Sequence, residues 1–302
     1  MERGSVSTIR RNVAIIGAGP SGLSAAIELR RLGVTHVTVY EREQQAGGIP
    51  RHTDHLGFGM RDLHRMMSGP RYARTLVERA TRAEVDLRIG TPVYSLDDLD
   101  ADVVILATGV RERPRAARLV PGDRPAGIYT TGSLQQLAHA GRRVGHRAVI
   151  VGAEHVSFSA ILTLAHVGCR AVAMVTPLPR HQSYGVIKLA TATRHRVPVL
   201  IGVDVAEIVG RRRVERVVLS DGRTIDCDSV VFTGDWIPDN ELARRSGLTM
   251  DHEIKGPSVD SAFRTSRDHV FAIGNLVHRV AAADRCALDG RAVAAAVVRS
   301  VA

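Results

Sequence analysis

A turn near the amino terminus has the glycine spacing of a phosphate-binding loop. An apolar run of four residues leads into G-x-G-x-x-G, with Gly17, Gly19 and Gly22 as its glycines. The first glycine permits a tight turn, the second lets backbone approach a pyrophosphate, and the third lets a helix pack closely on its strand. A helix that begins here directs unpaired N–H groups and a positive dipole end at a phosphate. Pro20 and Ser21 complete this predicted phosphate loop.

The residues after the turn complete the pattern of a dinucleotide-binding β-α-β unit. A helical stretch to Leu32 precedes an apolar strand at residues 37–40, which ends at Glu41. A carboxylate at this place accepts hydrogen bonds from the hydroxyls of a nucleotide ribose. Because strand, turn, helix, second strand and acid follow one another in order, this segment predicts a nucleotide site.

A second turn repeats the plan with altered chemistry. Gly152 keeps the first glycine, but Glu154 stands where the second belongs and Ser157 replaces the third. Each first glycine lies 24 positions before the end of the next strand (41 − 17 and 176 − 152). A repeat of this kind predicts two copies of one nucleotide-binding unit. Glu154 sets a side chain and a negative charge against a pyrophosphate, and Thr176 offers a ribose no carboxylate.

Two such copies predict an α/β fold with two Rossmann-like dinucleotide-binding domains, the second inserted into the first. Each copy closes on an apolar strand, at residues 103–109 and 230–234, and the tail returns a strand and a glycine turn at 270–274. No low-complexity linker separates the copies, which favours insertion over two successive domains. The expected boundaries are 1–112 with 253–302 for the first domain and 113–252 for the second.

Composition excludes several other classes of protein. The 302 residues, 44% apolar and 24% charged, suit two domains with substantial cores. No apolar run approaches the roughly 18 residues of a membrane span, and no hydrophobic leader follows the amino terminus, so a cytoplasmic location is expected. Cys169, Cys227 and Cys286 stand singly. This spacing argues against disulfides, an iron–sulfur cluster or any other metal site.

The net charge of +10 comes almost entirely from arginine. A basic protein can favour nucleic acid, but these arginines are spread over all segments and aromatic residues make up only 4% of the chain. Neither nucleic acid nor a membrane is therefore an expected partner. The arginine run at residues 211–213 is expected to form an exposed hairpin turn.

These segments resemble the pyridine nucleotide-disulfide oxidoreductase superfamily, whose members are flavoproteins with two dinucleotide-binding domains. The likeness covers nearly the whole chain, and its motifs are G-A-G-P-S-G at 17–22, Glu41, G-G at 47–48, A-T-G at 107–109 and V-F-A-I-G at 270–274. The chain is most similar to thiol-free members, the FAD-binding alpha-type subunits of opine oxidase, hydroxyproline dehydrogenase and hydrogen cyanide synthase complexes. The segments that carry this closer likeness are 47–52, 152–157 and 233–239.

The resemblance implies FAD in the first site. The phosphate loop would hold the pyrophosphate, Glu41 the adenosine ribose, and Val93 would lie near the adenine. Many relatives carry Asp at the position of Asn275. Asn275 can bond a hydroxyl as Asp does, but it lacks the negative charge. The implied cofactor-binding residues are Gly17, Gly19, Pro20, Ser21, Gly22, Glu41, Arg42, Gly48, Val93, Thr108, Gly109, Gly274, Asn275 and Arg285.

The resemblance also suggests catalytic candidates and a second nucleotide site. Arg51 and His52 follow a glycine turn that relatives place beside the flavin, although the alternative that both cap this loop and the nearby helix stays open. Cys286 falls in the first turn of a terminal helix that relatives direct at the flavin. The second site would comprise Gly152, Glu154, His155, Ser157 and Arg180. Its altered turn leaves two alternatives open, a bound NAD(P) or no nicotinamide nucleotide.

Two functions follow from these features. The first is an FAD-dependent oxidoreductase, or the electron-handling subunit of an amine- or imino-acid-oxidising dehydrogenase complex. Its partners would be a small amine or imino-acid donor or another oxidoreductase subunit, in a hetero- or homo-oligomer. The alternative is a non-catalytic structural or regulatory subunit that holds FAD, ADP or ATP. Because no close pair of cysteines is present, disulfide reduction is not expected.

Overall fold

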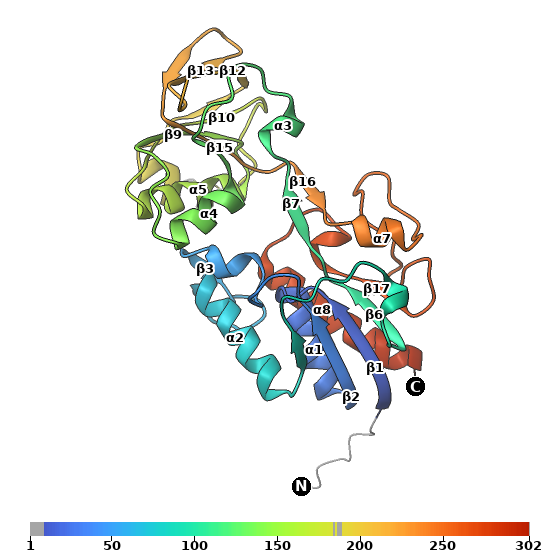
Figure 1. Cartoon of the computed structure of the whole chain (residues 1–302). Helices are drawn as coiled ribbons and strands as arrows, with labels where there is room; N and C mark the ends of the chain where they lie inside the picture. Colours follow the sequence, from blue (N-terminus) through green and yellow to red (C-terminus); the bar gives the residue numbers. More distant parts are fainter. Residues whose placement is uncertain (1–8, 184, 186–188, 302) are drawn as a thin grey trace. The chain divides into compact units, whose positions relative to one another are not determined.

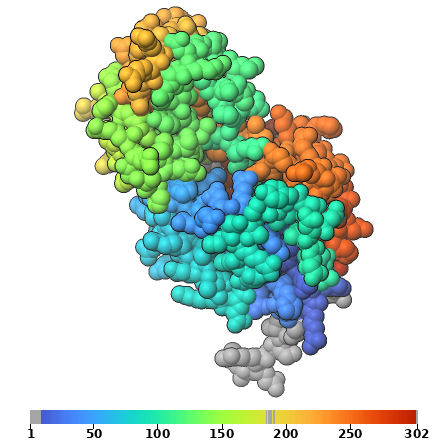
Figure 2. Space-filling view, in the orientation of Figure 1, coloured from blue at the N-terminus to red at the C-terminus, as the bar shows by residue number. Residues whose placement is uncertain are grey.

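The structure, a computed structural model, describes residues 9–183, 185 and 189–301, and these form two compact units (Figure 1). Unit 1 contains residues 9–51, 56–111 and 237–301, and unit 2 contains 52–55 and 112–236 among those described. In Figure 2 the orange and red carboxy-terminal residues of unit 1 adjoin its blue amino-terminal ones. Unit 2 is thus inserted into unit 1.

The return to unit 1 occurs earlier than the sequence suggested. The expected boundary at residue 252 is corrected to residue 236. The reason is that α7 (Glu241–Arg245) buries Leu242 and Ala243 in the hydrophobic core of unit 1, beside Ala14 and Ile16.

Unit 1 is built on a five-stranded parallel sheet with the order β17-β6-β1-β2-β5. Its strands are β1 (Ile9–Ile16), β2 (Val34–Tyr40), β5 (Asp86–Arg88), β6 (Val103–Leu106) and β17 (Val270–Ala272). Its longer helices are α1 (Pro20–Arg31), α2 (Gly69–Arg82) and α8 (Ala283–Val301). Strands β1, β6 and β17 carry runs of buried apolar residues, as expected for parallel strands that are covered on both faces.

Small residues let α8 pack closely on α1. A Cβ atom added at Gly290 would lie 2.2 Å from the carbonyl oxygen of Ser21 and 2.8 Å from the amide of Ala25. Only glycine permits this approach, which brings a helix near the end of the chain against the helix that follows the phosphate loop.

Short elements complete unit 1 and the connections. They are η1 (Ile49–His52), β3 (Leu56–Phe58), β4 (Met67–Ser68), η2 (Leu96–Asp98) and η4 (Gly274–Leu276). Strands β7 (Val110–Glu112) and β16 (Trp236–Pro238) form a two-stranded sheet where the chain passes between units. Among the described residues, no helix has the length and apolar character to cross a bilayer.

Unit 2 repeats the parallel sheet, with the order β11-β10-β9-β15-β8. Its strands are β8 (Ile128–Thr130), β9 (Arg147–Val151), β10 (Arg170–Thr176), β11 (Val199–Ile201) and β15 (Ser229–Phe232). Its helices are α3 (Arg115–Arg118), α4 (Thr131–His139), α5 (His155–His166) and the π-helical η3 (Leu189–Thr193). A separate antiparallel sheet contains β12 (Val205–Val209), β13 (Arg216–Leu219) and β14 (Thr224–Asp226).

The two sheets match strand for strand, with one permutation. In unit 1 the outer strand β17 and its helix α8 come last in the chain, whereas in unit 2 the equivalent β8 and α4 come first. The internal repeat that the two glycine turns predicted is therefore present in the fold.

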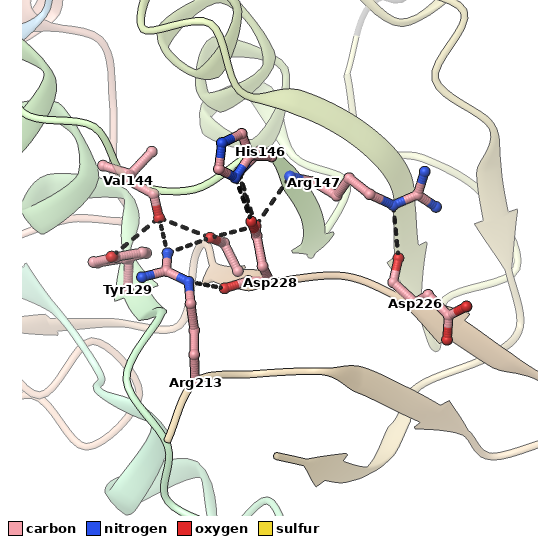
Figure 3. Close-up of polar contacts among 8 residues, drawn as sticks. Tyr129, Val144, His146, Arg147, Arg213, Asp226 and Asp228 are labelled. Carbon is pink, nitrogen blue, oxygen red and sulfur yellow. Dashed lines mark hydrogen bonds and ion pairs between the residues drawn. The ribbon is translucent and has the colours of Figure 1, made fainter. Parts of the chain in front are cut away.

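Arg213 departs from the expectation of an exposed arginine turn. Its guanidinium donates to the carbonyl of Asp228 (2.8 Å), to Ser229 Oγ (3.1 Å) and to the carbonyl of Val144 (Figure 3). Asp228 in turn accepts the backbone amide of His146 at 2.8 Å. This half-buried network fixes the beginning of β9, whose other end carries the second glycine turn.

Candidate functional site

The turn after β1 has a geometry that only glycine satisfies. Gly17 has a φ of 108°, and a Cβ atom there would lie 2.4 Å from the carbonyl oxygen of Ala107. A Cβ atom at Gly22 would lie 1.9 Å from the carbonyl oxygen of Gly17. At Gly19, by contrast, no atom lies within 4 Å of an added Cβ. The turn is closed on its protein side and open at Gly19.

The start of α1 presents free backbone donors to this open face. Gly19 is the N-cap residue, and no side chain caps the helix. Pro20 and Ser21 occupy the first turn, where helix amides lack intrahelical partners. An anion on the open face would meet these amides and the positive end of the helix dipole.

A second glycine turn lies against the phosphate loop. The amide of Gly47 donates to the carbonyl of Ala18 at 2.7 Å. Gly48 has a φ of 63°, and a Cβ atom there would lie 2.9 Å from Gly19 Cα. Any larger residue at Gly48 would therefore displace the phosphate loop.

Glu41 places its carboxylate at the edge of the same turn. Oε2 accepts the amide of Ala18 at 3.0 Å, and Oε1 accepts the amide of Glu43 at 2.9 Å. The neighbouring Arg42 instead pairs with Asp239 at 2.8 Å. Its guanidinium is thus already engaged within unit 1.

Thr108 and Gly109 contact the returning chain. Thr108 Oγ1 donates to the carbonyl of Asp239 at 2.7 Å, and the amide of Asp239 donates to the carbonyl of Gly109 at 2.9 Å. Val93 is half-buried and packs with Tyr40 against the apolar cluster of Ala14. The two hydrogen bonds to Asp239 fix the backbone that leaves β6 against the chain that returns after β16.

The third glycine turn, after β17, also meets the start of α1. Gly274 has a φ of 68°, and a Cβ atom there would lie 2.9 Å from Ser21 Oγ. The side-chain amide of Asn275, for which the sequence suggested a cofactor contact, bonds the chain itself. Its Oδ1 accepts the amide of Ala281 at 2.8 Å and its Nδ2 donates to the Ala281 carbonyl at 3.2 Å, so both ends of the amide hold the following loop.

The first turn of α8 contains a thiol that is shielded from solvent. Cys286 is buried, and burial raises the pKa of its thiol to about 12, so the sulfur stays protonated near neutral pH. Arg285 is exposed, and its Nε lies 3.3 Å from Asp289. This geometry gives no support to Cys286 as a thiolate nucleophile. Cys169 and Cys227 are likewise buried and free.

A charged network near α8 was missed by sequence reasoning. His278 Nε2 lies 2.7 Å from Asp289 Oδ2, and its Nδ1 lies 2.9 Å from the carbonyl of Arg279. Because both ring nitrogens face acceptors, the hydrogen bond to Asp289 raises the pKa of His278 and favours the imidazolium. The eleven-position separation of His278 and Asp289 matches no motif that the sequence displays.

A buried carboxylate in unit 1 also escaped notice. Tyr72 is fully buried and its hydroxyl donates to Asp62 at 2.7 Å. Burial raises the pKa of Asp62. Arg291 of α8 donates to the carbonyl of Asp62 at 2.9 Å, which joins this pair to the terminal helix.

The catalytic candidates Arg51 and His52 belong to different units. Arg51 Nε donates to the carbonyl of Gly48 at 3.1 Å, and its guanidinium pairs with Glu43, so it braces the second glycine turn. His52 lies in unit 2, with its ring centroid 5.5 Å from that of His139. The structure therefore gives these two neighbours in sequence different surroundings.

The turn of unit 2 is occupied by its own side chain. Glu154 Oε2 accepts the amide of Ala153 at 2.8 Å, and Oε1 accepts the hydroxyl of Thr233 at 2.9 Å. Ser157 Oγ lies 2.6 Å from Thr233 Oγ1 and accepts the amide of Glu154 at 3.2 Å. Gly152 thus precedes a closed polar network rather than an open face.

The other residues of the second site lie outside this network. His155 is exposed, and its Nδ1 lies 2.7 Å from Ser183 Oγ. Arg180 is exposed in the loop after β10. Among the residues that the structure describes, no group of three or more His, Cys, Asp or Glu side chains is arranged to hold a metal ion.

Comparisons with known proteins agree with this architecture. The family model described as pyridine nucleotide-disulphide oxidoreductase matches residues 11–290. The ferredoxin–NAD(+) reductase component of a benzene 1,2-dioxygenase system from Pseudomonas putida is 27% identical over 284 residues, covering 88% of this chain and 67% of that protein. An opine oxidase subunit from Agrobacterium tumefaciens (strain Ach5) is 25% identical, covering 94% of this chain and 65% of its own length. The chain thus spans about two thirds of such relatives.

Solved structures show the same fold. T. acidophilum thioredoxin reductase superposes with a TM-score of 0.82 at 22% identity, covering 97% of this chain and 99% of its own. The putidaredoxin reductase–putidaredoxin complex superposes with a TM-score of 0.72 at 20% identity, covering 95% of this chain and 75% of that chain.

The unit 1 turn fits the flavin dinucleotide of such proteins. Its face at Gly19 is open, its helix start is uncapped, and Gly48 and Gly274 bring further backbone against it without side chains. The comparisons give no support to a non-catalytic role. The chain belongs to the pyridine nucleotide-disulphide oxidoreductase family and is a flavin-dependent oxidoreductase with FAD as its cofactor.

Proposed function

We propose that unit 1 binds FAD at the phosphate loop and that the chain passes electrons between this flavin and a partner oxidoreductase protein. The observation that carries the proposal is the open face at Gly19 over the uncapped start of α1. FAD supplies reversible uptake of two electrons, and the protein supplies binding and orientation.

Each part of the turn has a distinct task in this proposal. Gly17 and Gly22 set the backbone, and Gly19 leaves the space that a pyrophosphate needs. The first amides of α1 donate to its oxygens. Each oxygen of Glu41 accepts one backbone amide and keeps a lone pair for a ribose hydroxyl.

Gly48 and Gly274 complete the binding surface. Their positive φ angles place backbone against the phosphate loop and against Ser21, where side chains would block a cofactor. Thr108 and Gly109 support the surface by holding Asp239, and we assign Arg42, Val93 and Arg285 supporting positions around it rather than direct bonds.

The partner is inferred from the relatives. One is named as the ferredoxin–NAD(+) reductase of a dioxygenase system and another as one of the subunits of opine oxidase, so both are described as parts of larger systems. By extension, this chain would exchange electrons with another oxidoreductase subunit, in a hetero- or homo-oligomer. A small amine or imino acid is the proposed primary donor. Cytoplasmic location and the absence of nucleic-acid binding stay predictions of the sequence.

An anaerobic titration of the purified protein tests this function. We expect a flavin spectrum that a panel of amino and imino acids bleaches, either directly or after a co-purifying protein is added. Dithionite should bleach the same flavin and calibrate full reduction. A flavin that dithionite reduces but that no donor or partner protein reduces or reoxidises would overturn the electron-transfer role.

A further inference from the structure

The two glycine turns are the same structure in backbone terms. Two hydrogen bonds recur at equivalent places: Gly17 N to Tyr40 O (2.8 Å) with Gly152 N to Val175 O (2.8 Å), and Gly47 N to Ala18 O (2.7 Å) with Gln182 N to Ala153 O (2.8 Å). The amides of Ala18 and Ala153 are therefore equivalent donors. Differences between the turns arise from side chains, not from the path of the chain.

The equivalent amides meet carboxylates of different origin. In unit 1 the amide of Ala18 donates to Glu41, which comes from the end of β2 and leaves the face at Gly19 open. In unit 2 the amide of Ala153 donates to Glu154, the next residue in the chain. The end of β10 offers only Thr176, whose hydroxyl accepts the amide of Leu178.

The Glu154 carboxylate packs tightly between two backbone segments. A Cβ atom added at Gly152 would lie 2.9 Å from Glu154 Oε2, and one added at Gly234 would lie 2.1 Å from Oε1. The hydroxyl of Thr233 bonds Oε1 and is itself held by Ser157. The side chain is therefore fixed inside the turn instead of extending into solvent.

A second carboxylate in unit 2, that of Glu112, lies at the start of helix α4. Glu112 Oε2 accepts the amide of Gly132, in the first turn of α4, at 2.7 Å. Helix α4 follows β8 as α8 follows β17 in unit 1. Arg118 lies near both Glu112 and Glu154 and donates to the carbonyl of Gly234 at 2.7 Å.

We infer that Glu154 occupies the phosphate position of unit 2, so that this unit binds neither NADH nor NADPH. A pyrophosphate would have to displace a carboxylate that already bonds Ala153 and Thr233, and it would meet the negative charge of Glu154. The guanidinium of Arg118, the nearby cation, already donates to the carbonyls of Arg113 and Gly234.

The inference limits where the electrons of the flavin can come from. If unit 2 holds no nicotinamide nucleotide, the electrons that reach the flavin come from a donor bound elsewhere. This consequence rests on the proposed function, whereas the assignment of Glu154 does not.

Isothermal titration calorimetry of the full chain with NADH and NADPH tests the assignment. We expect no saturation of the unaltered protein at concentrations up to about 1 mM, a range that covers ordinary enzyme affinities. Glu154→Gly restores the glycine and should tighten NADH or NADPH binding by about tenfold or more. Glu154→Ala should shift affinity in the same direction, and it carries the test if the glycine variant does not fold.

A charge-matched control separates the turn from overall electrostatics. Glu207 is exposed on β12, so Glu207→Ala removes one negative charge from unit 2 without opening the turn. It should leave nucleotide binding unchanged. Micromolar binding by the unaltered protein would overturn the inference, and so would folded Gly and Ala variants at Glu154 that bind no tighter than this control.

The calorimetry also distinguishes failure of the inference from failure of the proposed function. Binding of NADH to unit 2 is measured as heat and needs no flavin reduction. A protein that takes up no FAD but gains NADH binding on Glu154→Gly would support the inference and contradict the proposed function.

Discussion

The amide of Ala18 donates to the carboxylate of Glu41 over 3.0 Å, whereas the equivalent amide of Ala153 donates to Glu154 over 2.8 Å. In the first case the acid comes from a neighbouring strand, so the turn has a bonded donor and an open face. In the second the acid is part of the turn and fills it. Glutamate at the position of Gly19, together with Ser157 at the position of Gly22, thus distinguishes the closed turn of unit 2 from the open turn of unit 1.

The reactivity of the three thiols shows whether Cys286 can take part in catalysis. Burial raises the pKa values of Cys169, Cys227 and Cys286 to about 12 each, and thiols react as thiolates. We expect native protein to show no fast reaction with a thiol reagent at neutral pH, and all three cysteines to react after denaturation. Cys286→Ala should keep flavin reduction by the donor. A native thiol that reacts quickly, and that Cys286→Ala abolishes, would reinstate this residue as a catalytic candidate.

His278 gives the stability of unit 1 a defined pH dependence. The hydrogen bond to Asp289 raises the pKa of His278 from 6.5 in the folded state. The contribution is therefore complete below the unfolded pKa and is lost as pH rises through the higher folded pKa. His278→Gln should lower the free energy of unfolding by about 1–2 kcal/mol at about pH 5.5, and by less at about pH 9.

Denaturant unfolding of both proteins across this pH range measures the difference. His36→Gln is the control, because His36 is exposed on β2. It should change stability little at any pH. A gap between wild type and His278→Gln that stays constant or widens as pH rises would contradict the charged pair.

We predict that Asn275 contributes to the stability of unit 1 even when no cofactor is bound. Asn275→Ala removes both hydrogen bonds to Ala281 and should lower the free energy of unfolding of FAD-free protein by about 1–2 kcal/mol. Asn275→Asp keeps the bond to the Ala281 amide but loses the donor. Its free energy of unfolding should therefore lie between those of wild type and Asn275→Ala. Unfolding of the FAD-free proteins measures this. Equal stability with weakened FAD affinity would show that Asn275 serves the ligand directly.

Local sequence determined what could be predicted. The turns at Gly17 and Gly152 could be predicted because both positions have positive φ angles and leave no room for a Cβ atom, which excludes other residues. Parallel sheets and an inserted second copy follow from the same repeat. The pattern also identified Glu154 as the residue that distinguishes the copies.

The remainder depends on contacts between distant residues, which carry no local signal. A cofactor contact was expected of Asn275 by likeness to relatives. The two hydrogen bonds of its side-chain amide to Ala281 had no signal in the sequence, because only the fold determines the path of that loop. The charge run ending at Arg213 suggested exposure. Arg213 is instead half-buried, because its guanidinium donates to three acceptors, on Val144, Asp228 and Ser229. The return to unit 1 was placed late because α7 is too short to show a clear period.

Uptake of FAD by Gly19→Val is the most direct test of the central claim. The added side chain meets no protein atom within 4 Å of its Cβ, so the variant should fold, yet it enters the space proposed for the pyrophosphate. Gly132→Ala, at the start of α4, is the matched control, since its Cβ meets only Glu112 at 3.4 Å. Titration of FAD-free protein should show saturable binding by wild type and control, and affinity weakened by about tenfold or more in Gly19→Val. Wild-type affinity in a folded Gly19→Val, or no FAD uptake by the unaltered protein, would contradict the account.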